Sequence, residues 1–113
     1  MVKSSPYIPD AGDICWLEFD DERVGHEQKG PRPALVLTPV EYNKKTGLMI
    51  CCPMTSQVKG NPFEVLVAKN SAVLVDQVKS MAFRERNASK KSSVSHDILT
   101  EVRDKLALLL DIE

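Results

Sequence analysis

The sequence predicts a mainly β (β+α) protein, a small antiparallel β-barrel that ends in a C-terminal α-helix. Short apolar runs separated by turn residues recur along residues 13–83, as in small barrels. Residues 95–113 instead carry apolar side chains at helical spacing. A chain of 113 residues supports one modest core, so we expect a single domain over residues 1–113.

The first half of the barrel is read from two β-favouring runs. Residues 13–19 follow a turn at Gly12 and are predicted to form a strand. Residues 20–31 are polar and lack an apolar period, which predicts a loop. Two prolines flank Arg32 and hold the backbone extended before a buried strand at residues 34–37.

The second half begins with a predicted turn at residues 43–47 and a strand at residues 48–52. We expect Pro53 to end the regular pairing of that strand. Residues 55–62 form a second polar loop. The remaining strands are expected at residues 63–67, 72–75 and 78–83.

The tail is predicted to be one helix packed on the barrel. Ser95 is a suitable N-cap, and Asp97 lies in the first turn, where the helix dipole favours a carboxylate. The apolar stripe consists of Ile98, Leu99, Val102, Leu106, Leu109 and Leu110.

Composition excludes some functions. No run of 18 apolar residues exists, and the N-terminus lacks a signal core, so we expect a cytoplasmic protein without membrane contact. The net charge of -1 does not indicate a nucleic-acid binder by itself. However, residues 9–27 are strongly acidic and residues 78–91 strongly basic, which is compatible either with a local basic surface or with two solvated faces.

Cys15, Cys51 and Cys52 have no spacing that fits a zinc site, so no metal site is expected. All three lie in apolar runs and are predicted to be buried, reduced and unreactive.

The two polar loops carry residues suited to metal-independent RNA cleavage. In that reaction the 2'-hydroxyl of the substrate is the nucleophile, so the enzyme supplies a base, an acid and charge stabilisation. His26 or Glu27 suits the proton transfers, Arg32 suits the phosphate, and the hydroxyl of Thr55 can donate to a phosphate oxygen.

Structural interpretations of the same residues stay open at this point. Arg32 can instead pair with a carboxylate at a strand edge, and Thr55 can brace a turn. His26 and Glu27 can be ordinary surface residues. Spacing alone does not bring the two loops together.

At these residues the chain resembles the MazF/PemK family of toxin ribonucleases, and the MazF branch most closely. The resemblance runs from about Tyr7 to Leu110. It is carried by ordered blocks, namely Gly12-Asp13-Ile14, Trp16, Gly25-His26-Glu27-Gln28, Gly30, Arg32-Pro33-Ala34, Val36-Leu37, Tyr42-Asn43, Thr46-Gly47, Pro53, Thr55, Lys59-Gly60, Pro62-Phe63-Glu64-Val65 and Asp76-Gln77-Val78-Lys79-Ser80.

The resemblance implies an SH3-like barrel of the PemK/CcdB toxin type, assembled as a homodimer that needs no cofactor. It implies sequence-specific cleavage of single-stranded RNA, leaving 2',3'-cyclic phosphate and 5'-hydroxyl ends and thereby arresting translation and growth. Arg32 and Thr55 match the family's catalytic positions, and Glu27 an acidic position beside them. His26 and Asp76 match acid/base or supporting residues of the PemK branch. That branch has an arginine before its Asp-Gln pair where this chain has Leu74 and Val75, so Arg32 and Thr55 carry more weight.

The resemblance also implies an RNA-binding surface and an inhibitor. A cognate MazE-like antitoxin covers the RNA groove with an acidic, apolar C-terminal tail, and the basic stretch 79–91 suits both RNA and that tail. The expected RNA-binding residues are Gln28, Lys29, Ser56, Gln57, Lys59, Gln77, Lys79, Arg84 and Arg86.

Two other functions compete with the ribonuclease. One is a non-catalytic toxin barrel of the CcdB type that binds a protein target such as DNA gyrase. The other is a degenerate relative that only binds RNA or antitoxin. The presence of Glu27, Arg32 and Thr55 favours the enzyme over both.

Overall fold

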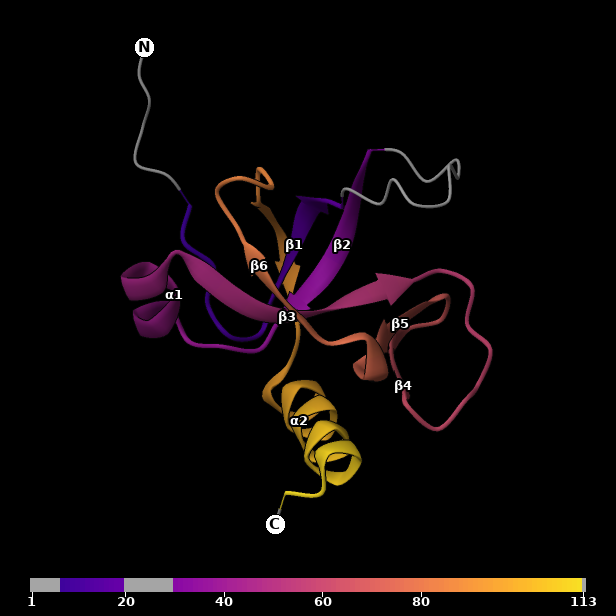
Figure 1. Ribbon diagram of the computed structural model, residues 1–113. Coiled ribbons are helices and arrows are strands. Elements are labelled where there is room, and N and C mark those ends of the chain that lie inside the picture. The colour runs from indigo at the N-terminus through magenta and orange to yellow at the C-terminus, as the bar shows by residue number, and fades with distance from the viewer. Residues whose placement is uncertain (1–6, 20–29, 113) are drawn as a thin grey trace.

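Strand β3 (Leu48–Thr55) is the centre of the fold and pairs with three other strands. The computed structural model describes residues 7–19 and 30–112. β2 (Pro31–Val36) lies along one edge of β3, while β5 (Ser71–Leu74) and β6 (Lys79–Ala82) share the other edge. Figure 1 shows β3 crossing the molecule from α1 (Val40–Thr46) to the β4–β5 hairpin.

The remaining strands extend this sheet on both sides. β1 (Asp13–Glu18) joins β2 to β7 (Ser89–Ser93), and β4 (Glu64–Ala68) pairs with β5. Every pairing is antiparallel, and the end strands β4 and β7 do not pair with each other within the described residues. The predicted antiparallel β fold with a C-terminal helix is therefore confirmed, as a half-barrel.

Two cores lie on opposite faces of β3, because successive residues of a strand point to opposite faces. The strand-side core is enclosed by β1, β2, β3 and β6 and consists of Cys15, Leu17, Ala34, Val36, Met49, Cys51, Met81 and Phe83. The helix-side core lies against α2 (His96–Leu110) and consists of Ile14, Leu35, Leu37, Cys52, Met54, Val65, Val73, Val75, Leu99 and Val102. All three cysteines are buried free thiols, as predicted.

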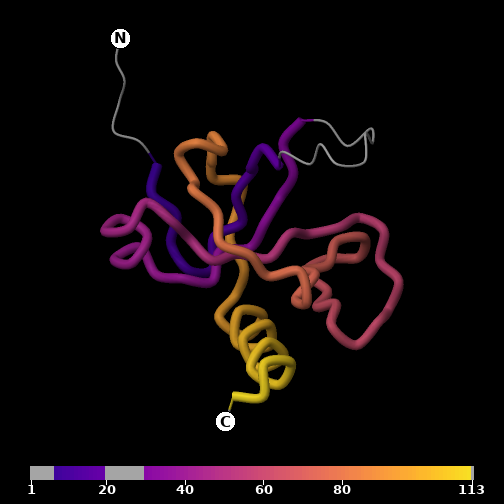
Figure 2. Tube along the Cα trace, in the orientation of Figure 1, coloured from indigo at the N-terminus to yellow at the C-terminus, as the bar shows by residue number. Residues whose placement is uncertain are grey.

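Helix α2 begins as the sequence predicts. The hydroxyl oxygen of Ser95 accepts a hydrogen bond from the backbone N–H of Ile98 at 3.2 Å, which caps the helix. Leu99 and Val102 are buried, but Leu109 and Leu110 are exposed, so the expectation that the whole stripe packs on the barrel is wrong. Figures 1 and 2 show the reason, since the last turns of α2 extend away from the sheet.

Residues 43–47 are not an isolated turn, because they form the end of helix α1 and its C-cap. Gly47 has a φ of 76°, the left-handed conformation in which glycine ends helices. Asn43 is fully buried, and its Nδ2 donates to the carbonyl oxygens of Pro9 at 2.7 Å and Thr38 at 2.9 Å. These tertiary hydrogen bonds hold an asparagine in a helix that its propensity does not favour.

Pro53 ends the pairing of β3 with β2, as expected, but it does not end the strand. It lies opposite Ala34 of β2, and β3 continues to Thr55 by pairing with β5 on its other edge. β2 likewise starts earlier than predicted, at Pro31, because both of its prolines pair with β1. Smaller differences concern Val75, which lies in the 3-10 helix η1 (Val75–Gln77), and β7, which was not predicted.

No helix within residues 7–19 and 30–112 has the length and apolar character needed to cross a membrane.

Candidate active site

Arg32 lies in β2 on the face of the strand-side core. Its partner in β1 is Leu17, and residues directly opposite each other in an antiparallel pair share a face. The guanidinium lies 5.4 Å from the ring centroid of Phe19, and the side chain is half-buried. The only ion pair found among the described residues joins Lys90 to Asp13, so no carboxylate in these ranges pairs with Arg32.

Thr55 is the last residue of β3 and is also on this face. The last pair between β2 and β3 is Ala34 with Pro53, so Arg32 and Thr55 each lie two residues beyond it, one on each strand. In a strand, residues two apart share a face, which puts both side chains on the side of Ala34 and Pro53. Figure 1 shows that the start of β2 and the end of β3 diverge. Arg32 is the second residue of β2 and Thr55 the last of β3, so each lies in one of the two diverging segments.

The hydroxyl of Thr55 makes one hydrogen bond within the described ranges, in which its oxygen accepts from the backbone N–H of Gln57 at 2.9 Å. This is the turn-bracing contact that the sequence left open as an alternative. It fixes the hydroxyl oxygen but does not use its proton, and no acceptor for that proton is found in the described part of the chain. The hydroxyl of Thr55 can therefore brace this turn and also donate a hydrogen bond to a substrate.

Lys79 brings a second cation to the ring of Phe19. It opens β6 opposite Cys51, a residue of the strand-side core, so it shares the face of Arg32. Its Nζ lies 5.3 Å from the ring centroid. Sequence reasoning did not select Phe19, although it continues the alternation of Cys15 and Leu17 onto the same face.

The loop after Thr55 is folded around the carboxylate of Glu64. Its Oε1 accepts from the backbone N–H groups of Gly60 at 2.7 Å and Lys59 at 3.0 Å, and its Oε2 lies 3.3 Å from the Nδ2 of Asn61. Glu64 was not selected from the sequence either, because it lies in a strand and not in the loop that it organises. Within this loop, Ser56, Gln57 and Lys59 are exposed, as RNA-binding residues need to be.

Asp76 and Gln77 lie in η1 and are exposed. The element η1 packs against β3. Burial raises the pKa of the Cys52 thiol to about 12, and the charge of Asp76 adds to this shift. No hydrogen bond or ion pair found among the described residues joins Asp76 to Arg32 or Thr55.

The basic residues between 84 and 91 do not all lie on one face, because Lys90 and Lys91 are on opposite faces of the sheet. The guanidinium of Arg84 lies 5.1 Å from the ring centroid of Phe83, and that of Arg86 donates to the carbonyl oxygen of Glu18 at 3.4 Å. Lys90 pairs with Asp13 at 3.6 Å, whereas Lys91 lies 5.4 Å from the ring centroid of Trp16, on the opposite face of β1.

Four candidates, His26, Glu27, Gln28 and Lys29, lie outside the described residues. No group of His, Cys, Asp and Glu that suits a metal ion is found within residues 7–19 and 30–112.

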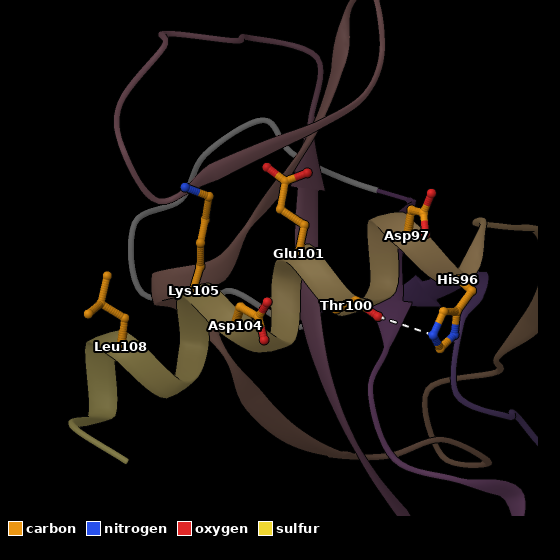
Figure 3. A pocket seen from close by; sticks show the side chains of 7 residues that line it. All are labelled: His96, Asp97, Thr100, Glu101, Asp104, Lys105 and Leu108. Carbon is orange, nitrogen blue, oxygen red and sulfur yellow. Dashed lines mark hydrogen bonds between the residues drawn. The ribbon is translucent and has the colours of Figure 1, made fainter. Parts of the chain in front are cut away.

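A shallow hollow along α2 is not the candidate site. Its described lining includes Asp97, Glu101 and Asp104, whose charges repel a phosphate, and none of the candidate residues (Figure 3). His96 and Thr100 interact with each other there, with Nε2 and Oγ1 3.4 Å apart.

Comparison with known proteins places this geometry in a family. Residues 10–110 match the family model described as PemK-like, MazF-like toxin of type II toxin-antitoxin system. The chain is 46% identical to the endoribonuclease toxin MazF of Escherichia coli K12 over 109 residues, 94% of this chain and 97% of that protein. It is 30% identical to the endoribonuclease PemK of Escherichia coli over 84% of this chain and 77% of PemK.

Solved structures agree with these matches. A crystal structure of MazE-MazF from Deinococcus radiodurans superposes with a TM-score of 0.85 at 43% identity, covering 95% of this chain and all of the other. A second crystal form gives a TM-score of 0.85 at 47% identity, covering 95% of this chain and 99% of the other. The chain belongs to the PemK-like, MazF-like family of toxins of type II toxin–antitoxin systems.

Proposed function

We propose that residues 1–113 form a single endoribonuclease toxin domain that cleaves single-stranded RNA at a short sequence without a metal ion. The 2'-hydroxyl of the substrate attacks the adjacent phosphorus, which gives a 2',3'-cyclic phosphate and a free 5'-hydroxyl end. The observation that carries the proposal is the position of Arg32 and Thr55 at facing places beyond the last β2–β3 pair, on one face of the sheet. The names of the relatives support an endoribonuclease and not a gyrase-binding barrel of the CcdB type.

Arg32 stabilises the charge that develops on the phosphorane. Its planar fork of donors suits two phosphate oxygens, and no carboxylate in the described ranges neutralises it. The flanking prolines limit the backbone freedom of β2, so the guanidinium is held before the substrate arrives.

The hydroxyl of Thr55 donates a hydrogen bond to a phosphate oxygen, while the N–H of Gln57 holds the hydroxyl oxygen in position. The proton transfers at the 2'-hydroxyl and the leaving 5'-oxygen are assigned to His26 and Glu27, of which Glu27 is catalytic and His26 an acid/base or supporting residue. Asp76 has a supporting role at most, because the PemK-type arginine before it is replaced by Leu74 and Val75.

The RNA follows the face that carries Arg32, Lys79 and the loop folded around Glu64. Lys79 and Lys59 bind phosphates, and the exposed amide of Gln57 contacts bases. Gln28, Lys29, Ser56, Gln77, Arg84 and Arg86 extend this path.

A MazE-like antitoxin neutralises the enzyme by covering the same face with an acidic tail. Solved relatives include complexes named MazE-MazF, which supports such a partner. Because one surface serves both ligands, binding of the antitoxin and of RNA is mutually exclusive. The toxin acts on messenger RNA in the cytoplasm, where its substrate is, and thereby stops translation and growth.

The toxin is a homodimer whose subunits meet through apolar residues left exposed on α2 and β4. Leu108 is 74% exposed and Leu110 53%, while Leu66 of β4 is 57% exposed. α2 contacts β4, so these leucines belong to neighbouring elements. Leucines this exposed at the end of a core-packed helix are typical of a surface that another subunit covers.

The test is to incubate the purified protein with one long RNA in EDTA and to sequence the 5' ends of the fragments. We expect discrete cuts at one short sequence, with 5'-hydroxyl and cyclic-phosphate ends. Arg32→Ala should lose at least about 100-fold in rate, the range for a lost transition-state donor, whereas the exposed Lys44→Ala is the matched control. Intact RNA, or equal cutting by Arg32→Ala, would reject the proposal, and a stable gyrase complex without cleavage would favour the CcdB-type barrel.

A further inference from the structure

We propose that Phe19 is a positioning residue of the active site, which holds the Arg32 guanidinium and the Lys79 ammonium through its ring. The inference rests on the proposed ribonuclease function and adds to it a residue with no chemistry of its own. It is carried by two distances, 5.4 Å from the guanidinium carbon to the ring centroid and 5.3 Å from the ammonium nitrogen to the same centroid.

Three separate elements meet at this ring. Phe19 directly follows β1, Arg32 belongs to β2, and Lys79 opens β6. Arg32 lies opposite Leu17, and Phe19 is two residues further along the chain from Leu17, which makes it the diagonal neighbour of Arg32, a spacing that long side chains bridge. The two charges cannot be further apart than the sum of their distances from the ring.

A ring is the appropriate partner for a catalytic arginine. The face of a phenyl group attracts a cation electrostatically but accepts none of its N–H groups in a strong hydrogen bond. A carboxylate would instead neutralise the guanidinium and occupy its donors. The contact with Phe19 leaves the charge and the N–H donors of Arg32 available for the phosphorane.

The ring also makes the approach of two like charges tolerable. Arg32 and Lys79 repel each other, and no carboxylate within the described ranges pairs with either. Attraction to the shared ring offsets part of that repulsion in the free enzyme, and an anion bound on this face offsets more of it. Two cations on one ring therefore favour binding of an anion, and an RNA phosphate is such a ligand.

The first experiment measures the ring–cation contacts directly in the wild-type protein by NMR. Side-chain protons of Arg32 and Lys79 above an aromatic face should resonate upfield of the exposed Arg103 and Lys44, and Phe19→Leu should abolish the displacement. Signals of Arg32 and Lys79 at ordinary positions would overturn the inference. This readout does not depend on cleavage.

The second experiment measures kinetics on the RNA that the wild-type protein cuts. Phe19→Leu keeps an apolar side chain and removes the aromatic face, so kcat should fall about 3- to 30-fold, the range that one or two cation–ring contacts span. Phe19→Trp should restore most of kcat, which a purely volume-filling role would not do. The salt dependence of RNA binding should stay unchanged in Phe19→Leu, because no phosphate-binding charge is removed.

The outcomes separate the two proposals. If the wild-type protein does not cut RNA, the ribonuclease function fails, while the NMR displacement still decides the role of the ring. If the wild-type protein cuts RNA and Phe19→Leu keeps full kcat, the function stands and the positioning role of Phe19 is rejected. If Phe19→Leu does not fold, Phe19→Trp and the wild-type NMR measurement decide, and ordinary Arg32 shifts there reject the role.

Discussion

The carboxylate of Glu64 accepts a hydrogen bond from the backbone N–H of Gly60 at 2.7 Å, and so ties the loop after Thr55 back to β4. Glu64→Ala removes this anchor, along with the bond from the N–H of Lys59 at 3.0 Å. Both bonds are exposed to solvent, which weakens them, so we expect the affinity for RNA to fall about 3- to 10-fold as the loop becomes less ordered.

Affinity for a 2'-O-methyl RNA, which cannot be cut, measures this effect by fluorescence anisotropy. Glu101→Ala on α2 is the matched control, since that glutamate is exposed and has no hydrogen bond among the described residues. Equal affinity in Glu64→Ala and the control would remove this loop from the RNA path.

The hydroxyl of Thr55 is tested by an isosteric change. Thr55→Val keeps the shape of the side chain and removes the proton donor, so kcat should fall about 100-fold with a smaller change in KM. Thr55→Ser should recover most of the activity, and Thr100→Val on α2 is the control. A loss confined to KM would move Thr55 from the chemistry to binding.

Asn43 is predicted to be the most sensitive polar residue for stability. Its side chain bonds to Pro9 and Thr38, and Thr38 in turn accepts the backbone N–H of Ile50 at 3.0 Å. Asn43→Ala leaves buried polar groups unpaired, so the free energy of unfolding should fall by about 2–4 kcal/mol. Urea denaturation measures it, and the exposed Asn70→Ala should stay within about 0.5 kcal/mol of wild type.

The three cysteines make stability depend on alkaline pH. Burial raises the pKa of Cys15, Cys51 and Cys52 from 9.0 to about 12 each. The folded state therefore keeps these protons between pH 9 and 12, whereas the unfolded state releases them. The stabilisation is complete below pH 9 and is lost as the pH rises towards 12, so the free energy of unfolding should decrease over that range.

Thiol labelling gives an independent measure of the same burial. At pH 8 all three thiols should resist iodoacetamide in the native protein and react fully in urea. Rapid labelling of any one of them without unfolding would contradict the burial of that cysteine.

The exposed leucines of α2 and β4 predict where the subunits meet. Leu108→Glu and Leu66→Glu should each weaken the dimer at least about tenfold, as expected for a charge placed in an apolar interface. Sedimentation over a concentration series measures the change. Leu48→Glu, at the start of β3, is the control, and dimers unaffected by both changes would place the contact elsewhere.

The sequence predicted those elements whose determinants are local. The turn expected at Gly12 forms, with this glycine in a left-handed conformation, and Ser95 caps α2 just before the apolar stripe, as predicted. The strands were predicted for the same reason, because alternation of apolar and polar residues can be recognised within a few consecutive positions.

What the sequence did not reveal depends on distant contacts. Residues of α1 were read as a turn, since the bonds that hold Asn43 come from Pro9, 34 positions away. β7 is polar throughout and is a strand only because β1 offers it an edge. Phe19 and Glu64 were not predicted as site residues, because neither takes part in the chemistry itself. Their contacts with other site residues arise only in the folded structure.

Cys51 and Cys52 are neighbours in the chain, yet they belong to different cores on the two faces of β3. Strand β3 therefore contributes side chains to both the strand-side core and the helix-side core. Unfolding of either core would expose the face of β3 that the other core covers, so both cores should unfold in a single transition. The slowest amide hydrogen exchange should occur along Cys51–Met54. Thr55 is the last residue of β3, so its backbone is held in place by the segment that we expect to exchange most slowly.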